Sequence, residues 1–417
     1  MKSPTLRIGM VGAGMIFDET YRPAFLDLAR TPLFSRATGP VEVKLAGIAS
    51  RTGGRAAKYR AELAASLGDF ATPSGPDALA ALLASGVDAV CIATPDDRHF
   101  DAAKAALAAG KHVLIEKPSV LRLAERRELE ALAAAQGVLA KVVYHKLLDP
   151  DHKRLRTLVA DGVLRHVNHG YCSLLEPKSI ATGQFAEWIA GRNPSTYVAC
   201  HYIKLIDFTF GGRLRRIYAN GQRGIVGPAA GDTWDSVQLR LVYEYDTGRE
   251  AAFDIHTSWV TPDNFPGYVE QEVQFRFDNG VWNGHSRKRG VELTVEGETP
   301  LGRKITINNH YNGSFLEPWG ERAQRGYGVE VIERFFAEVA AVEFGGPLGE
   351  RPARLAAARG LAYDDLTADL HTVAAVQATE AILAGRVAGH DCSAELDAAG
   401  RLLLWRTGDS EPRVLDP

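Results

Sequence analysis

Residues 112–118 read HVLIEKP, and this run decides the fold that we expect for the first part of the chain. Its apolar residues predict a buried strand of a parallel sheet, which ends abruptly at a carboxylate, an ammonium and a proline. Because proline disfavours the helical region for the preceding residue, the strand cannot continue into a helix at Lys117. Parallel sheets bind ligands beyond the carboxyl ends of their strands, so we expect Lys117 at the mouth of a crevice.

Strand and helix patterns alternate over residues 1–148, which is typical of a doubly wound parallel sheet in an α/β fold. We expect Gly110 to cap the helix before it in the left-handed conformation. The predicted strands are 7–11, 41–49, 88–93, 112–115 and 140–144, and the predicted helices are 100–109 and 123–135.

The pattern changes after about residue 150, where apolar and polar residues alternate, as in 238–243 and 272–277. This period of two predicts antiparallel strands with one covered face. A chain of 417 residues exceeds one ordinary core, so we predict a first domain over 1–148 and a second over 149–417. Three further helices are predicted in the second domain, over 152–160, 329–342 and 364–384.

The composition argues against several classes of function. The net charge of −3 is too small for a nucleic-acid surface, and the dense basic run 287–289 predicts a solvated turn or a contact for an acidic sugar. No apolar run reaches membrane-spanning length and no signal peptide is recognisable, so we expect a cytoplasmic protein. Neither the four cysteines nor the twelve histidines have metal-ligand spacing, and we predict no metal site.

A glycine turn follows the first predicted strand and precedes a helix pattern, which is the context of a dinucleotide fingerprint. Gly12 permits the tight turn, and Gly14 lets the backbone approach a pyrophosphate that binds helix amides, at Met15 and Ile16. The third small position holds Phe17, so this bulky side chain must displace the helix or point along the cofactor. An ordinary glycine turn is the alternative.

The end of the second predicted strand indicates which dinucleotide binds. NAD sites favour an acidic residue there, whereas NADP sites favour an arginine. The run here contains Ser50 and Arg51, with Arg55 one turn later and no acid. Ser50 could bond a 2′-phosphate while Arg51 pairs with it in a bidentate geometry. We therefore expect NADP, with NAD tolerated; the alternative is that Arg51 only caps a surface loop.

The glycine turn, the ATP run 93–95 with His99, and the EKP run 116–118 together resemble the glucose-fructose oxidoreductase / inositol dehydrogenase / MocA (Gfo/Idh/MocA) family of sugar and polyol dehydrogenases. The resemblance implies a Rossmann domain followed by an α/β domain with a large open, mainly antiparallel sheet. That sheet often forms the oligomer interface, so we expect a homodimer or homotetramer. The resemblance also implies a nicotinamide cofactor between the domains, with Thr94 and Pro95 lining the crevice and His99 behind them.

The same resemblance makes Lys117 a catalytic residue on the nicotinamide side, with Glu116 shaping its loop. A lysine beside a positively charged nicotinamide gives up its proton more readily, which suits proton exchange with a hydroxyl or carbonyl. The family resembled here also carries a helix with an Asp, a His four residues later and then a second Asp. His201 falls at the family histidine, Tyr197 at the first Asp and Lys204 at the second.

The three positions 197, 201 and 204 share one face of a regular helix, so the chain is expected to present a Tyr–His–Lys stripe. Without the usual carboxylate, either His201 is the acid/base or Tyr197 acts alone or orients the imidazole. For His201 the alternative is a hydrogen-bonded interior histidine.

Substrate contacts are predicted at Lys146, just past a strand end where the family often has an arginine, and in polar-aromatic clusters containing Trp282 and His310. Flat aromatic faces with amides and imidazoles suit carbohydrates or cyclitols, although such clusters could also cover an oligomer-forming face. The sequence thus predicts an NAD(P)-dependent oxidoreductase acting on a secondary alcohol or ketone of a sugar, glycoside or inositol. The alternatives are NAD-assisted glycoside cleavage without net oxidation and a non-catalytic dinucleotide-sensing regulator.

Overall fold

The computed structural model divides the chain into two compact units. One consists of Met1–Leu148 and Tyr311–Asp369, and the other of Asp149–His310 and Leu370–Pro417. The first holds a mainly parallel sheet and the second a mainly antiparallel sheet, which confirms the predicted fold class. The described residues are 3–184, 186, 189–227, 232–265, 269–285, 291–293 and 305–415.

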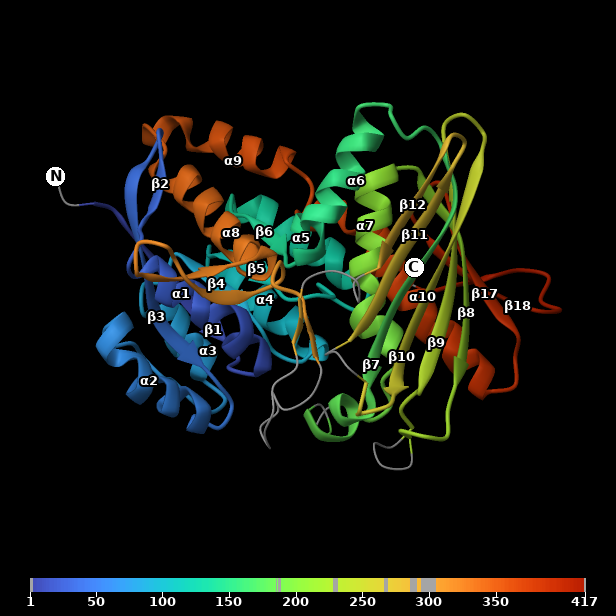
Figure 1. Ribbon diagram of the computed structural model, residues 1–417, viewed down its shortest axis with the longest axis horizontal. Helices are drawn as coiled ribbons and strands as arrows, with labels where there is room; N and C mark the ends of the chain where they lie inside the picture. The colour runs from blue at the N-terminus through green and yellow to red at the C-terminus, as the bar shows by residue number, and fades with distance from the viewer. Residues whose placement is uncertain are drawn as a thin grey trace. The chain divides into compact units, whose positions relative to one another are not determined.

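The sheet of the first unit has six strands within the described residues. These are β1 (Thr5–Val11), β2 (Leu33–Ser35), β3 (Gly39–Ala49), β4 (Ala89–Ile92), β5 (His112–Ile115) and β6 (Ala140–Val142). Their order is β2-β3-β1-β4-β5-β6, and all neighbours run parallel except the edge strand β2 (Figure 1). The strand order reverses at β1, and open parallel sheets bind ligands at such a switch point.

Helices connect these strands as the alternating pattern predicted. The strand expected over 112–115 coincides with β5, whose residues are all buried. Gly110 has a φ of 69°, the left-handed conformation expected after a helix. The strand expected over 140–144 ends at Val142 because the chain turns into a short 3-10 helix, His145–Leu148. The helices are α1 (Arg22–Leu28), α2 (Gly54–Leu67), α3 (Ala78–Ala84), α4 (His99–Ala108) and α5 (Leu123–Gln136).

A return segment, residues 311–369, packs with the first unit, although we expected it in the second domain. The apolar face of its long helix joins the core of the parallel sheet, where Phe336 and Phe25 have ring centroids 5.7 Å apart. The pattern over 329–342 predicted this apolar face but not which sheet it covers. The segment contains β15 (Gly313–Leu316), β16 (Arg322–Arg325), α8 (Tyr327–Phe344) and α9 (Arg351–Gly360).

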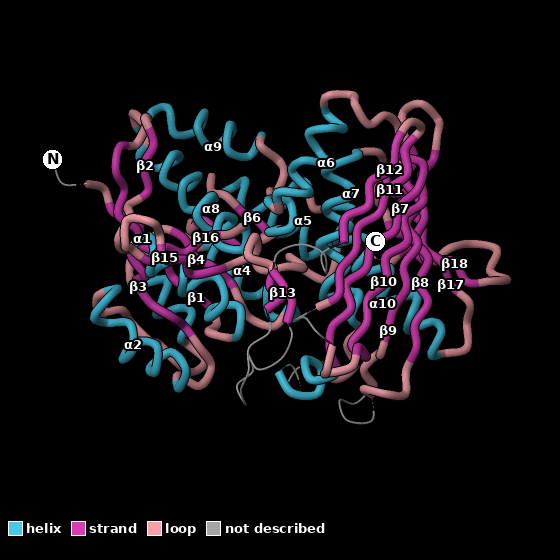
Figure 2. Tube along the Cα trace, viewed as in Figure 1, coloured by secondary structure: helices cyan, strands magenta, loops and turns pink. Residues whose placement is uncertain are grey.

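The large sheet of the second unit has nine strands in the part of the chain that the structure describes (Figure 2). They are β7 (Val167–Pro177), β8 (Arg213–Gln222), β9 (Ser236–Glu244), β10 (Glu250–Thr261), β11 (Glu270–Phe277), β12 (Gly280–His285), β17 (Cys392–Leu396), β18 (Leu402–Arg406) and β19 (Arg413–Val414). Their order is β12-β11-β7-β10-β9-β8-β17-β18-β19. Neighbours are antiparallel except β7 and β10.

The predicted strands 238–243 and 272–277 lie within β9 and β11, and their alternating burial gives the sheet one covered face. The helices of this unit are α6 (Pro150–Ala160), α7 (Cys200–Phe210) and α10 (Leu370–Val387). The helix expected over 364–384 begins later, because a 3-10 turn occupies Leu366–Ala368. None of the helices built from the described residues is long and apolar enough to cross a membrane.

Candidate functional site

The glycine turn after β1 has the geometry that a dinucleotide site requires. Gly12 has a φ of 94°, and a Cβ on this residue would collide with the carbonyl of Ala93 at the end of β4. A Cβ on Gly14 would meet no atom within 4 Å, so the space beside this residue is open. Only glycine fits the first position, and a pyrophosphate can approach the backbone at the second.

The helix after this turn begins at Met15 and Ile16, which are both half-buried, and then widens into a π-helix over Phe17–Tyr21. Phe17 is fully buried and its ring centroid lies 4.8 Å from that of Tyr59 on α2. The bulky residue at the third fingerprint position therefore points into the core and not along a cofactor. The wide π turn marks where the backbone departs from an ordinary helix.

The end of β3 presents two guanidinium groups to solvent. Arg51 and Arg55 are exposed, the second on the first turn of α2. Ser50 lies beside them, and its hydroxyl oxygen accepts a hydrogen bond from the N–H of Gly53 at 3.2 Å. The Ser50 hydroxyl proton remains available to a ligand, because a hydroxyl both accepts and donates. This end of the sheet can therefore bind an anion.

At the end of β4, the hydroxyl oxygen of Thr94 is buried and makes no hydrogen bond within the described structure. Buried hydroxyls normally have a partner, so Thr94 fits a site that a polar ligand completes. Pro95 is half-buried and begins the next turn. The open space at Gly14 and this unsatisfied hydroxyl together fit a bound dinucleotide.

His99 joins this turn to the loop of the EKP run. Its Nε2 lies 2.9 Å from the carbonyl oxygen of Thr94, and its Nδ1 lies 2.8 Å from that of Pro118. Burial lowers the pKa of His99, and the charge of Lys117 lowers it further. A neutral imidazole has one N–H, so only one of the two carbonyls receives a full hydrogen bond at a time. His99 thus packs behind both loops.

The EKP run places a buried acid beside the lysine at the end of β5. Glu116 is 7% exposed, and the hydroxyl of Tyr21 donates a hydrogen bond to its Oε1 at 3.1 Å. Burial raises the pKa of Glu116 to about 7, and the charge of Lys117 lowers it in part. Lys117 itself is half-buried. Sequence reasoning missed Tyr21, because only the fold brings residues 95 positions apart together.

The end of the neighbouring strand β6 leads to Lys146, which is 4% exposed. Side chains of the return segment surround this strand end: the His145 ring lies 5.3 Å from that of Tyr311 and 5.9 Å from that of Tyr327. Tyr311 directly follows His310 in the polar-aromatic cluster at residues 308–312, which we expected in the second domain, so that cluster is split between the units. His310 remains in the second unit and is exposed in a turn.

The second unit places His201 and Lys204 three residues apart on α7, where they are 3% and 1% exposed. Tyr197 lies in the preceding π-helix, Ser195–Ala199, so the regular helical face expected for all three residues begins only at Cys200. The Tyr197 ring centroid lies 6.5 Å from that of Trp259. The regular helix therefore carries His201 and Lys204, and Tyr197 lies in the π-helical turn that precedes it.

Asp207, an acidic residue of α7 that contacts Lys204, was missed in the sequence analysis. Asp207 Oδ2 lies 4.0 Å from Lys204 Nζ, and its Oδ1 lies 2.6 Å from Nδ1 of His371 on α10. Asp207 follows Lys204 by three residues, so the pair lies on one helical face, and this spacing was visible in the sequence.

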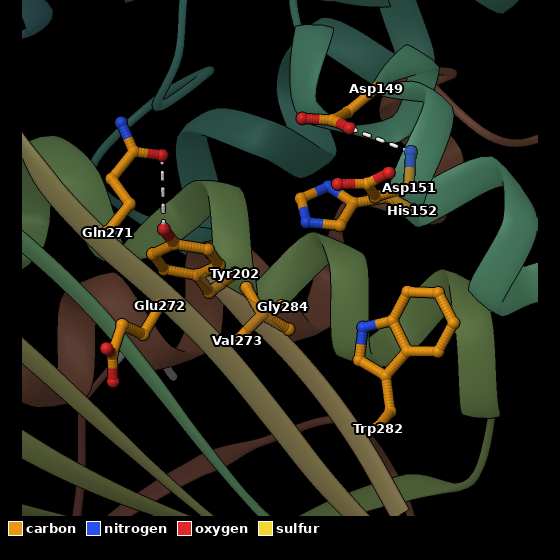
Figure 3. Close-up of a pocket in the computed structure, with 9 residues that line it drawn as sticks. All are labelled: Asp149, Asp151, His152, Tyr202, Gln271, Glu272, Val273, Trp282 and Gly284. Atoms are coloured by element: carbon orange, nitrogen blue, oxygen red, sulfur yellow. Dashed lines mark hydrogen bonds between the residues drawn. The ribbon is translucent and has the colours of Figure 1, made fainter. Parts of the chain in front are cut away.

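Trp282 lines a pocket in the second unit that is partly open to solvent (Figure 3). Its indole nitrogen is buried and has no hydrogen-bond partner among the described residues. Figure 3 shows the indole across the cavity from Tyr202, whose hydroxyl hydrogen-bonds Gln271 at 3.4 Å. The other lining residues are Asp149, Asp151, His152, Glu272, Val273 and Gly284.

Two further expectations concern the basic run and a metal site. The basic run 287–289 lies outside the described residues. Among the residues that are described, no group of three or more His, Cys, Asp or Glu side chains is arranged to hold a metal ion.

Part of the first unit matches a known sequence family. Residues 6–144 match the GFO_IDH_MocA profile, described as an oxidoreductase family with an NAD-binding Rossmann fold. The chain is 46% identical over 81 residues to the uncharacterized oxidoreductase YdgJ of Escherichia coli (strain K12), covering 19% of this chain and 23% of YdgJ. It is 32% identical over 82 residues to scyllo-inositol 2-dehydrogenase (NADP(+)) IolW of Bacillus subtilis (strain 168), and the match covers 20% of this chain and 23% of IolW. These matches span about a quarter of each relative.

Solved structures resemble the chain over most of its length. An inositol dehydrogenase homolog from Azotobacter vinelandii, complexed with NADH and myo-inositol, has a TM-score of 0.63 at 19% identity, covering 93% of this chain and 96% of that one. GenD2 from gentamicin A biosynthesis, in complex with NAD, has a TM-score of 0.62 at 20% identity, and the match covers 95% of this chain and 97% of GenD2. At these identities the similarity shows the shared fold.

Proposed function

We propose that this chain, whose residues 6–144 match the GFO_IDH_MocA family of oxidoreductases with an NAD-binding Rossmann fold, oxidises or reduces a secondary alcohol or ketone of a sugar, glycoside or inositol. One observation carries this proposal: Gly14, Thr94 and Lys117 all lie at the carboxyl edge of the same parallel sheet. The open backbone at the glycine and the unsatisfied hydroxyl at the threonine suit a dinucleotide, and the lysine supplies a group that can exchange protons.

The cofactor would bind at the glycine turn, with its pyrophosphate against the backbone at Gly12 and Gly14. We propose that NADP is preferred, because the exposed guanidinium groups of Arg51 and Arg55 can pair with a 2′-phosphate and Ser50 can donate to it. When bound, a nicotinamide cofactor accepts or donates a hydride. The residues of the chain must therefore bind the substrate and manage the proton of its hydroxyl.

Lys117 is the proposed proton-exchanging group on the cofactor side. Its ammonium can donate a hydrogen bond to a substrate oxygen, and its amine can take the hydroxyl proton as the alcohol is oxidised. Glu116 directly precedes Lys117 and accepts a hydrogen bond from Tyr21, which holds the chain at this strand end. General acid–base catalysis of this kind contributes typically about 10²- to 10⁴-fold to the rate.

His201 is the second proposed proton carrier, by its match to the family histidine. In this chain no carboxylate stands four residues before it, and Tyr197 takes that place. We propose that Tyr197 orients the imidazole, since a phenolic hydroxyl can both donate and accept a hydrogen bond. Lys146 and Lys204 are proposed to contact the substrate, together with His310.

Trp282 supports a carbohydrate or cyclitol as the substrate. Its flat indole lines a cavity that also presents an amide, a phenol and carboxylates, which are groups that hydrogen-bond sugar hydroxyls. The buried indole N–H has no partner among the described residues, so a hydroxyl oxygen can accept from it. Two of the proteins named above, IolW of Bacillus subtilis and the Azotobacter vinelandii homolog, act on or bind an inositol, which supports the same substrate class. We propose a homo-oligomer formed through the large sheet.

A cofactor-reduction screen tests the proposal. The enzyme is mixed with NAD or NADP and a panel of sugars, inositols and uronates, and formation of the reduced cofactor is followed by its absorbance. We expect turnover with at least one polyol, and faster turnover with NADP. Glycoside cleavage without net cofactor reduction, or cofactor binding with no reaction on any glycoside or polyol, would contradict it.

A further inference from the structure

Asp369 is a fully buried carboxylate whose two oxygens each accept a hydrogen bond from a different hydroxyl. Its Oδ2 lies 2.5 Å from the Ser119 hydroxyl, and its Oδ1 lies 2.6 Å from that of Tyr144. Both hydroxyls belong to buried residues as well. Both distances are at the short end of the range for O–H···O hydrogen bonds, so Asp369 firmly links two chain segments.

The two segments carry the lysines of the proposed site. Ser119 follows Lys117 by two residues, and Tyr144 precedes Lys146 by two. The strands that lead to them, β5 and β6, are parallel neighbours in the sheet. Asp369 therefore joins the loop after β5 to the loop after β6 through one side chain.

The link coincides with the places where the chain passes from one unit to the other. These passages follow Leu148, His310 and Asp369. Beside them, Tyr144 bonds Asp369, and the rings of His145 and Tyr311 lie 5.3 Å apart. The return segment thus ends on the loop that carries Lys117.

We propose that Asp369 is a positioning residue that holds Lys117 in a fixed relation to the strand end carrying Lys146. This inference rests on the proposed function, because it gives Lys117 a role in the chemistry. Asp369 is buried, and its two hydrogen bonds to Ser119 and Tyr144 connect it to both loops. Asp369 affects the rate by keeping Lys117 in position, because a displacement of about 1 Å at a reacting group can lower the rate about 100-fold.

The first experiment compares variants by steady-state kinetics and by cofactor titration. Asp369→Ala is expected to lower kcat by about 10- to 100-fold, with little change in KM or in the Kd of the reduced cofactor, because the glycine turn is untouched. Asp369→Asn is expected to recover part of kcat, since an amide can still hydrogen-bond both hydroxyls. Unchanged kcat in Asp369→Ala, for an enzyme whose wild type turns over, would overturn the proposal.

Glu343→Gln is the matched control. Glu343 also lies on the return segment, where it accepts a hydrogen bond from Nε2 of His112 at 2.8 Å, and His112 begins β5 at the end opposite Lys117. This variant is expected to lower the melting temperature and leave kcat unchanged. Equal losses of kcat in Glu343→Gln and Asp369→Ala would show a merely structural role and overturn the proposal.

A second measurement does not depend on finding a substrate. The rate at which an amine-selective acylating reagent labels Lys117 is measured by mass spectrometry, relative to Lys58, whose side chain is 69% exposed. We expect a changed relative rate in Asp369→Ala, and smaller changes in Ser119→Ala and Tyr144→Phe, which each remove one hydrogen bond. A rate equal to wild type in all three would contradict positioning by Asp369, whereas a wild type that reduces no cofactor contradicts only the proposed function.

Discussion

The hydroxyl of Tyr21 donates a hydrogen bond to the buried carboxylate of Glu116, with 3.1 Å between the oxygens. Burial dominates at this site and raises the pKa of Glu116 to about 7. The charge of Lys117 and the Tyr21 hydrogen bond oppose the shift without cancelling it. The folded protein therefore binds a proton at Glu116 that the unfolded chain loses near the ordinary glutamate pKa of about 4.3.

This shift predicts a pH-dependent stability. Because the folded state holds more protons than the unfolded state, stability should fall as the pH rises from about 4.5 to about 7 and then level off. Over this range the free energy of unfolding should fall by about 3 kcal/mol, because the pKa of Glu116 is about 7 in the folded protein and near its ordinary value in the unfolded chain. Glu116→Gln should remove this loss, so its urea midpoint should exceed that of wild type at about pH 8 and approach it at about pH 5. Identical pH dependence in both proteins would contradict the assignment.

The proposed NADP preference predicts a selective effect of the arginines at the end of β3. Replacing both Arg51 and Arg55 by alanine removes charge-assisted hydrogen bonds worth about 1.5–3 kcal/mol each, so the Kd of NADPH should rise at least about 10-fold. The Kd of NADH should stay the same. Fluorescence titration measures both. Arg60→Ala is the control, because Arg60 lies on the same helix but pairs with Asp69 at 2.6 Å. A parallel rise for both cofactors would disprove recognition of the 2′-phosphate.

A buried ion pair predicts a large stability effect in the first unit. Lys141 on β6 is fully buried, with its Nζ 2.9 Å from Asp364 and 3.4 Å from Glu338 of the return segment. Burial raises the pKa of Asp364, which Lys141 partly offsets. Removing the cation leaves these carboxylates buried without it, so Lys141→Met should cost about 3–5 kcal/mol in urea unfolding.

Lys44→Met serves as the comparison for that measurement. Lys44 lies on β3 of the same sheet and pairs with Glu42 at 3.5 Å, but both side chains are exposed. Exposed pairs contribute about 0–1 kcal/mol, so this variant should unfold close to wild type. If Lys141→Met and Lys44→Met lowered the free energy of unfolding by similar amounts, the predicted contribution of the buried ion pair would be wrong.

Local patterns carried most of the fold prediction for the first unit. The run that forms β5, the glycine turn at Gly12 and the cap at Gly110 each follow from neighbouring residues, and the structure shows all three. These features are decided within a few positions, where apolar periodicity and glycine chemistry act directly.

Features set by distant contacts could not be predicted in this way. The apolar face of α8 was visible in the pattern, but either sheet could have covered it. Asp369 meets Ser119 across 250 positions of sequence, and only the folded return segment brings them together. The π-helices at Phe17–Tyr21 and Ser195–Ala199 also depart from the regular helical period, and the sequence pattern did not predict them.

Lys117→Ala tests the central claim most directly. The rate of NADP reduction is measured for wild type and variant with the best polyol from the screen, together with the Kd of NADPH. The account predicts at least about a 100-fold loss of turnover, because a general acid–base group is removed, with the Kd nearly unchanged. Lys104→Ala should retain full activity, because Lys104 on α4 forms an exposed ion pair with Glu128 on α5. Near-normal turnover by Lys117→Ala would contradict the role of this lysine.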